Sequence, residues 1–104
     1  MKRLTPSQLR AAARTIPNWT RRGQVLSRTW TFADFPGSLA FVNAVGAVAE
    51  AAGHHPDITI RWNRVILDLT THDAGGLTER DVALASALDQ LPSAAPKRRR
   101  KAQA

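Results

Sequence analysis

The sequence contains no cysteine, and this absence excludes several kinds of chemistry at once. A disulfide, a thiolate nucleophile and a cysteine-ligated zinc site all require that side chain. Any catalysis must therefore depend on histidine, aspartate, glutamate, serine or threonine.

Long uninterrupted apolar runs are also missing. The most apolar stretch, residues 39–52, is interrupted by Asn43 and Glu50, whereas a membrane-spanning helix needs roughly 18 consecutive apolar residues. No apolar segment follows the basic opening MKRLTPSQLR, so we expect no secretory signal. We therefore predict a cytoplasmic protein without a membrane span, and the length of 104 residues favours one folded domain.

Acidic residues are absent from the first 28 positions, which hold seven lysines and arginines. Residues 29–96 contain three basic and eight acidic residues, and residues 97–101 read KRRRK. The net charge of +7 thus comes from the two ends, which weakens a nucleic-acid-binding interpretation of the domain. We expect a domain at 1–92 and a disordered basic tail at 93–104, in which Lys97 to Lys101 bind polyanions weakly and without specificity.

Three segments have the pattern of capped amphipathic helices. The run TPSQ at 5–8 is a capping-box variant that predicts a helix over about 6–16. Asp34 can cap a second helix, whose apolar stripe stops before Gly53. The run TERD at 78–81 predicts the start of a third helix.

Two pairs of strands separate these helices. Residues 25–32 place Leu26, Trp30 and Phe32 on one face, and a short strand near Trp19 is expected to pair with them. The order α-β-β-α-β-β-α favours an α+β two-layer domain, in which helices cover an antiparallel sheet.

The second pair of strands is predicted from strict alternation over residues 58–69. A two-residue turn at Asn63-Arg64 would put Trp62 opposite Val65 and six apolar side chains on one buried face.

The three histidines all lie in or beside the turns of the second half of the chain: His54, His55 and His72. Imidazole has an unperturbed pKa of about 6.5, so it can give and take protons near neutral pH. Strand alternation predicts that His72 points away from the core, on the same side as Thr70. Acid-base catalysis is therefore the leading interpretation.

The spacing of these residues is more specific than their number. Along the chain stand Glu50, then His54-His55-Pro56 after three residues, Trp62 after five, His72 after nine and Asp81 after eight. This pattern resembles the pterin-4a-carbinolamine dehydratase family, and the segment GHHPDITIRWNRVILDLTTHDAGGLTERDVALA is similar to that family's C-terminal half. The resemblance covers about residues 5–91 and is strongest from Thr31 onward.

This resemblance implies a four-stranded antiparallel sheet with three helices on one face. It implies a lyase that removes water from 4a-hydroxytetrahydropterin and gives quinonoid dihydropterin, in tetrahydrobiopterin recycling after aromatic amino acid hydroxylation. It also implies a homodimer or homotetramer and a hydroxylase as pathway partner. No metal or redox cofactor is needed, because the pterin is the substrate.

The resemblance also implies roles for individual residues. His54 and His72 match the general acid and base, while His55 matches a residue that mainly holds the pterin. Further positions that match substrate contacts are Pro56, Thr70, Thr71 and Asp73. Asp81, Glu50 and Trp19 match positions that support the site in this family.

Some of these residues also have a structural interpretation. Asp81 can cap its helix as readily as it can orient an imidazolium. Glu50 is expected to face solvent or a neighbouring subunit, and Trp62 and Trp30 to lie in the core. Gly53 departs from the family pattern, in which Asp or Asn often precedes the histidine pair, and it supplies no side chain for the pterin.

Three alternatives stay open. Histidines together with Glu50 or Asp81 could form a zinc or iron site. A partner-binding module of the same fold, used as a dimerisation or assembly factor, would not need to be an enzyme. A polyanion-binding protein would depend on the KRRRK segment. A dehydration assay, metal analysis and removal of the tail would distinguish these alternatives.

Overall fold

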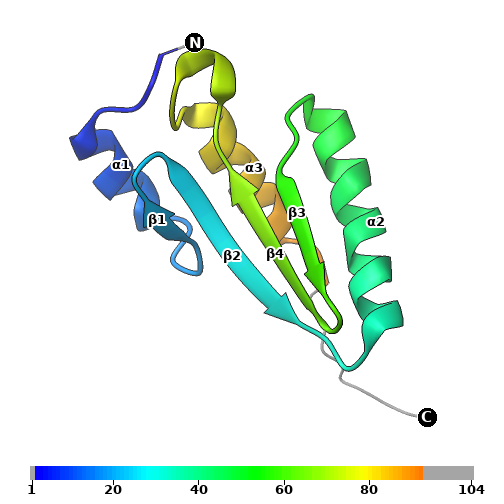
Figure 1. The fold of residues 1–104 in the computed structure, drawn as a ribbon. Helices are drawn as coiled ribbons and strands as arrows, with labels where there is room; N and C mark the ends of the chain where they lie inside the picture. Colours follow the sequence, from blue (N-terminus) through cyan, green and yellow to red (C-terminus); the bar gives the residue numbers. More distant parts are fainter. Residues whose placement is uncertain (1, 93–104) are drawn as a thin grey trace.

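The computed structural model describes residues 2–92, so the predicted basic tail at 93–104 lies outside the described residues. The elements, in chain order, are α1 (Pro6–Ala13), β1 (Thr20–Arg22), β2 (Val25–Thr31), α2 (Phe35–Ala52), β3 (Asp57–Arg61), β4 (Arg64–Leu69), the 3-10 turn η1 (His72–Ala74) and α3 (Glu79–Asp89) (Figure 1). This order confirms the predicted α-β-β-α-β-β-α arrangement.

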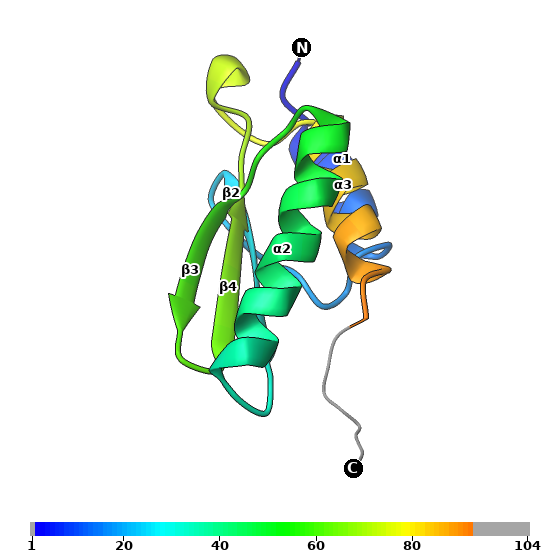
Figure 2. The same ribbon diagram turned by 90° about the vertical axis from the view of Figure 1, so that its right-hand side faces the viewer.

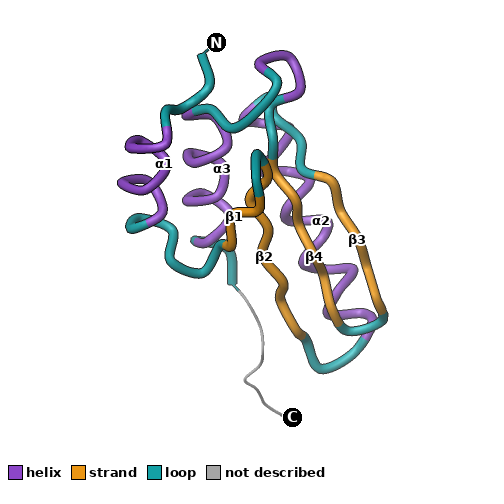
Figure 3. The backbone as a smooth tube through the Cα atoms, turned by 60° about the vertical axis from the view of Figure 1, so that its left-hand side comes forward, coloured by secondary structure: helices purple, strands orange, loops and turns teal. Residues whose placement is uncertain are grey.

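The four strands form one antiparallel sheet in the order β1-β2-β4-β3. All three α-helices lie on one face of this sheet (Figure 2), and Figure 3 shows the strands side by side, with α2 behind them and α1 and α3 to the left. The predicted two-layer α+β fold is therefore confirmed, with β1 and β3 at the two edges.

Local hydrogen bonds at the helix ends follow from the sequence. Thr5 and Gln8 form a capping box at the start of α1, although this helix ends at Ala13 and not near residue 16. The Asp34 side chain accepts a hydrogen bond from the Gly37 amide at 2.9 Å and caps α2. Gly53 ends α2 with φ 64°, a left-handed conformation that glycine adopts without strain.

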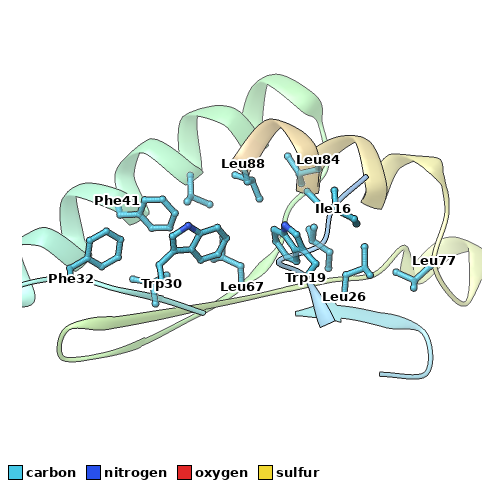
Figure 4. Packing of buried hydrophobic residues seen from close by; sticks show 14 of the residues in the cluster. Ile16, Trp19, Leu26, Trp30, Phe32, Phe41, Leu67, Leu77, Leu84 and Leu88 are labelled. Atoms are coloured by element: carbon cyan, nitrogen blue, oxygen red, sulfur yellow. The ribbon is translucent and has the colours of Figure 1, made fainter. Parts of the chain in front are cut away.

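Buried apolar side chains from the helices and the sheet form one core between the two layers (Figure 4). Trp30 lies near its centre, 5.6 Å from Trp19 in an edge-to-face arrangement and 4.9 Å from Phe41, measured between ring centroids. The guanidinium of Arg28 stacks on the Trp30 ring and pairs with Asp89 of α3. The sheet and α3 are thus joined by apolar packing and by one half-buried ion pair.

The β3–β4 hairpin differs from its predicted register. Arg61 pairs with Arg64, so the two turn residues are Trp62 and Asn63. Trp62 has φ 51° and is 64% exposed, so the predictions that it lies opposite Val65 and in the core are wrong.

Contacts from outside the hairpin explain this turn. The Ser38 hydroxyl donates to the Trp62 carbonyl at 2.7 Å. The backbone amide of Phe32 donates to the Asn63 carbonyl at 2.7 Å, and the Asn63 side-chain amide donates to the Phe32 carbonyl at 3.0 Å. These bonds hold a tryptophan in a conformation that non-glycine residues seldom adopt. The observed pairing differs from the predicted one by two residues, so Ile58 and Ile60 stay on the face of their partners in β4. Ile58 is nevertheless 40% exposed and Ile60 half-buried on this edge strand, so the prediction that all six apolar side chains are buried is wrong.

Among the helices of residues 2–92, α2 is the one that is long and apolar enough to cross a membrane, by length and composition only. The helix contains the two polar interruptions of its apolar stretch, Asn43 and Glu50, and the absence of a membrane span stays a prediction. Core helices of folded domains can be equally long and apolar. The buried residues of α2, which include Phe41, Val45 and Ala49, lie on the side of the helix that packs against the sheet and α3. Most of the helix surface nevertheless lies outside the core and is built from small and apolar side chains.

Candidate active site

Three segments meet at the end of the sheet that is uppermost in Figure 1: the end of α2, the segment after β4, and the first turn of α3. Between them lies a hollow of about 290 Å³. Its lining residues are Gly53, His54, His55, Thr70, Thr71, His72, Asp73 and Arg80. The fold therefore brings all three histidines to one place, although 18 positions separate His54 from His72.

His54 is held in place on both its backbone and its ring. It follows Gly53, and its amide donates to the Ala49 carbonyl at 3.2 Å, at the end of α2. Its ring is nearly buried, and Nε2 lies 2.6 Å from Oδ1 of Asp81, which is fully buried. The imidazole therefore has a fixed orientation in the wall of the hollow.

Asp81 is the centre of a buried hydrogen-bond network. Its Oδ2 accepts from the Thr71 hydroxyl at 2.8 Å and from the Thr78 amide at 2.9 Å. The two threonine hydroxyls lie 2.9 Å apart, and the Thr78 hydroxyl also accepts from the Arg80 amide at 3.2 Å. Because the Thr71 hydroxyl donates to the carboxylate, it accepts from Thr78. The predicted capping role and the predicted histidine-orienting position of Asp81 thus occur together in one side chain.

The network determines which nitrogen of His54 can exchange a proton. A carboxylate only accepts hydrogen bonds, so Nε2 of His54 carries the proton that points at Asp81. The exchangeable position of the ring is therefore Nδ1.

The segment after β4 is tied to the β1–β2 turn by Gln24. The Thr70 hydroxyl donates to the Gln24 carbonyl at 2.7 Å, and the Leu77 amide donates to Oε1 of Gln24 at 2.8 Å. Thr71 and Gly76 form an isolated antiparallel bridge. A Cβ at Gly76 would lie 2.3 Å from Oε1 of Gln24, so only glycine allows this close approach. The bridge and the glutamine fix both ends of the loop that contains His72.

His72 and His55 are more open than His54. The strand ends at Leu69, so His72 does not continue the strand alternation from which its direction was predicted; it begins η1 and is exposed, away from the core. His55 is also exposed, and its Nε2 lies 2.9 Å from Oε1 of Glu50. Glu50 faces solvent, as predicted. The hollow thus has one buried imidazole and two at its rim.

Four predicted site residues do not line the hollow. Asp81 lies behind it, bonded to His54, and Glu50 contacts it only through His55. Pro56 is half-buried beside it. Trp19 lies in the core, where its Nε1 donates to Oδ1 of Asp89 at 2.8 Å. Its predicted supporting position near the pocket is therefore not where the structure places it.

Arg80 lines the hollow although no sequence pattern predicted it as a site residue, and its Nη2 donates to the Gly53 carbonyl. Arg80 lies between the N-cap residue Thr78 and Asp81 in sequence. The pattern of this segment is explained by helix capping, so it does not indicate that Arg80 lines a pocket. Within residues 2–92, no group of three or more histidine, aspartate or glutamate side chains is arranged to hold a metal ion.

The sequence matches the family model described as pterin 4 alpha carbinolamine dehydratase over residues 2–91. A relative from Thermomicrobium roseum is 54% identical over 93 residues, which is 89% of this chain and 100% of the relative. One from Chloroflexus aurantiacus is 52% identical over 91 residues, 88% of this chain and 98% of the relative. Both have the provisional name pterin-4-alpha-carbinolamine dehydratase.

Two solved structures are also similar. A Brucella melitensis protein described as a transcriptional coactivator/pterin dehydratase has a TM-score of 0.79 and 31% identity, over 85% of this chain and 96% of that one. A pterin dehydratase-like protein described as a RuBisCO assembly factor in the alpha-carboxysome has a TM-score of 0.55 and 25% identity, over 68% and 82% of the two chains.

Proposed function

Because this chain belongs to the pterin 4 alpha carbinolamine dehydratase family, we propose that it dehydrates a 4a-hydroxytetrahydropterin to a quinonoid dihydropterin. The observation that supports this most directly is the meeting of three histidines around one hollow, with His54 bonded to the buried Asp81. The substrate would come from aromatic amino acid hydroxylation, and the product would return to tetrahydrobiopterin by reduction.

The proposed reaction needs two proton transfers. The bond between C4a and the hydroxyl oxygen breaks with its electron pair on oxygen, and this oxygen takes a proton to leave as water. The neighbouring ring N–H loses a proton, and the nitrogen electrons form the new C=N bond. No metal or redox cofactor enters this balance, and positioned acid-base groups accelerate such steps by about 10² to 10⁴.

His54 and His72 are suited to these two transfers because they belong to different walls of the hollow, one after α2 and one in η1. His54 would act through Nδ1, with Asp81 holding Nε2 and stabilising the imidazolium when it forms. His55, at the rim, would mainly hold the pterin, together with Thr70, Thr71 and Asp73.

A carbinolamine dehydration assay tests this proposal. We expect wild-type protein to accelerate dehydration over buffer, and His54→Ala and His72→Ala each to lower kcat by about 100-fold or more while the fold is retained. His55→Ala should mainly raise KM, because it removes binding that ground and transition states share. Folded wild-type protein that gives no acceleration would refute the assignment.

We further propose that the chain forms a homodimer or homotetramer. Within residues 2–92, no further strand pairs with either sheet edge, most of the α2 surface is not buried, and Phe35 and Leu39 of α2 are exposed. Sedimentation at micromolar concentration should give a mass of two or four chains, and a mass of one chain would contradict the proposal.

A second candidate function is partner binding without catalysis. It is supported by the two structural relatives described as a transcriptional coactivator/pterin dehydratase and as a RuBisCO assembly factor. The apolar outer surface of α2 would be the contact face. The catalytic proposal is preferred because partner binding through α2 would not require three imidazoles around one hollow, and the dehydration assay separates the two.

A further inference from the structure

Arg80 is a cation in the wall of the hollow that the proposed proton transfers do not use. It lies in the first turn of α3 and is half-buried. Nη2 donates to the carbonyl of Gly53, which fixes the guanidinium at the boundary between α2 and α3. A guanidinium has five N–H donors, and this is the one hydrogen bond that it makes to the described residues. Donors are therefore left over for a ligand.

The charge of Arg80 is not balanced by an ion pair within the described part of the chain. Glu79, its neighbour in sequence, lines a different groove, between α1 and α3. Asp81 is already bonded to His54, Thr71 and Thr78. Asp73 also lines the hollow, but it belongs to η1 and forms no ion pair with the guanidinium.

The absence of a side chain at Gly53 leaves one side of the Arg80 guanidinium uncovered. A Cβ at position 53 would lie 3.8 Å from Nη2 of Arg80, so a short side chain there would come against the guanidinium. Glycine leaves that approach empty, and its left-handed conformation is one that asparagine and aspartate can also adopt. The hollow thus exposes a positioned cation beside three imidazoles.

We infer that Arg80 selects pterins whose substituent carries a negative charge, such as a carboxylate or a phosphate. This inference rests on the proposed pterin-binding function and assigns a substrate class to the same hollow. A guanidinium binds such groups through paired N–H donors, and the bond to Gly53 pre-orients it. Because Arg80 is only half-buried, solvent weakens the effect, and we expect a preference of roughly three- to tenfold.

The test compares two fluorescent pterins that differ in one group, pterin-6-carboxylate and neutral 6-hydroxymethylpterin. Their Kd values are measured by fluorescence titration against the full chain. Wild type should bind the carboxylate more tightly, and the preference should shrink as salt is raised. Arg80→Gln should bring the ratio of the two Kd values to about one, whereas Arg10→Gln, which removes an exposed charge from α1, should leave the ratio unchanged.

A second pair of variants keeps Arg80 and separates charge from backbone strain. Gly53→Asp and Gly53→Asn place side chains of equal size in the same left-handed position. Only the aspartate neutralises the guanidinium, so Gly53→Asp should lose the preference while Gly53→Asn keeps most of it. If Arg80 only clamps α2 to α3, Arg80→Gln will lower thermal stability and weaken both pterins equally, and the ratio will not move.

The outcomes separate this inference from the proposed function. Equal wild-type affinity for the two pterins, or a preference that survives Arg80→Gln, would overturn the selectivity and leave pterin binding intact. Failure of folded wild-type protein to bind either pterin would count against the proposed function and against this inference with it.

Discussion

His54 and His55 are neighbours in sequence, and the ring of each is hydrogen-bonded to a carboxylate. The first of these two pairs is buried, whereas the second is exposed to solvent. In the His54–Asp81 pair the atoms are 2.6 Å apart and the side chains are 10% and 0% exposed. In the His55–Glu50 pair the distance is 2.9 Å and the side chains are 62% and 82% exposed. The distances are similar, so the difference lies in what surrounds them.

Burial, more than contact distance, therefore determines what a histidine–carboxylate pair can do. Solvent screens the exposed pair, and either side chain can leave it at little cost. Asp81 accepts hydrogen bonds from three residues and can move only if all of them move. Removing one donor leaves the buried carboxylate short of a hydrogen bond, and removing Asp81 leaves all three donors without their acceptor; either change is costly. The buried pair is therefore preorganised, and the exposed pair is adaptable.

The largest effect is expected from Asp81→Asn. The amide has nearly the same shape, but its NH₂ group must face a donor, either Nε2–H of His54 or the Thr71 and Thr78 donors. We expect a loss of about 2–3 kcal/mol in the free energy of unfolding, measured with urea, and about a 100-fold lower kcat because His54 no longer has a fixed tautomer. A kcat within twofold of wild type would show that Asp81 serves only as a cap.

An intermediate effect is expected from Thr71→Val, which keeps the side-chain shape and removes the hydroxyl between Thr78 and Asp81. The free energy of unfolding should fall by about 1–2 kcal/mol. Thr29→Val is the matched control, because Thr29 is an exposed strand residue. Equal stability of the two variants would mean that the hydroxyl chain contributes nothing to the buried pair.

The smallest effect is expected from Glu50→Gln. Because the His55–Glu50 pair is exposed, the unfolding free energy should change by less than about 0.5 kcal/mol. Kinetic assays should show kcat unchanged and KM raised by less than about twofold. If this variant lowers kcat as strongly as Asp81→Asn does, the contrast between the two pairs does not hold.

Elements that depend on local chemistry could be predicted from the sequence. The capping boxes at Thr5 and Thr78, the Asp34 cap and the left-handed Gly53 all involve atoms within a few residues of one another. The two hairpins and the helical layer followed from apolar periodicity, because one face of each element had to be buried.

Features that depend on distant residues could not be predicted in this way. The hairpin turn lies at Trp62-Asn63 because Ser38 and Phe32 bond to it from outside, against the usual preference of tryptophan for negative φ. Similarly, His72 lies in η1 and not in a strand, because the backbones of Thr71 and Gly76 bond to each other and close a short loop that strand alternation does not reveal.

The candidate site was predicted in its histidines and in Asp81, since these follow a spacing pattern. The site role of Arg80 was not predicted, because Arg80 and its partner Gly53 are 27 positions apart. The residues next to Arg80 in sequence predict only that it belongs to a helix. Trp19 was placed at the pocket by resemblance, whereas its indole reaches across the core to Asp89.

The position of Trp62 gives the molecule a built-in optical label. The chain has three tryptophans and no tyrosine, and Trp62 alone among the three is open to solvent, whereas Trp19 and Trp30 lie ring against ring in the core. Iodide should therefore quench the red side of the intrinsic emission, which comes from the hairpin tip, and leave the blue side, which comes from the interior. One fluorescence spectrum thus reports separately on the tip of the sheet and on the packing beneath it.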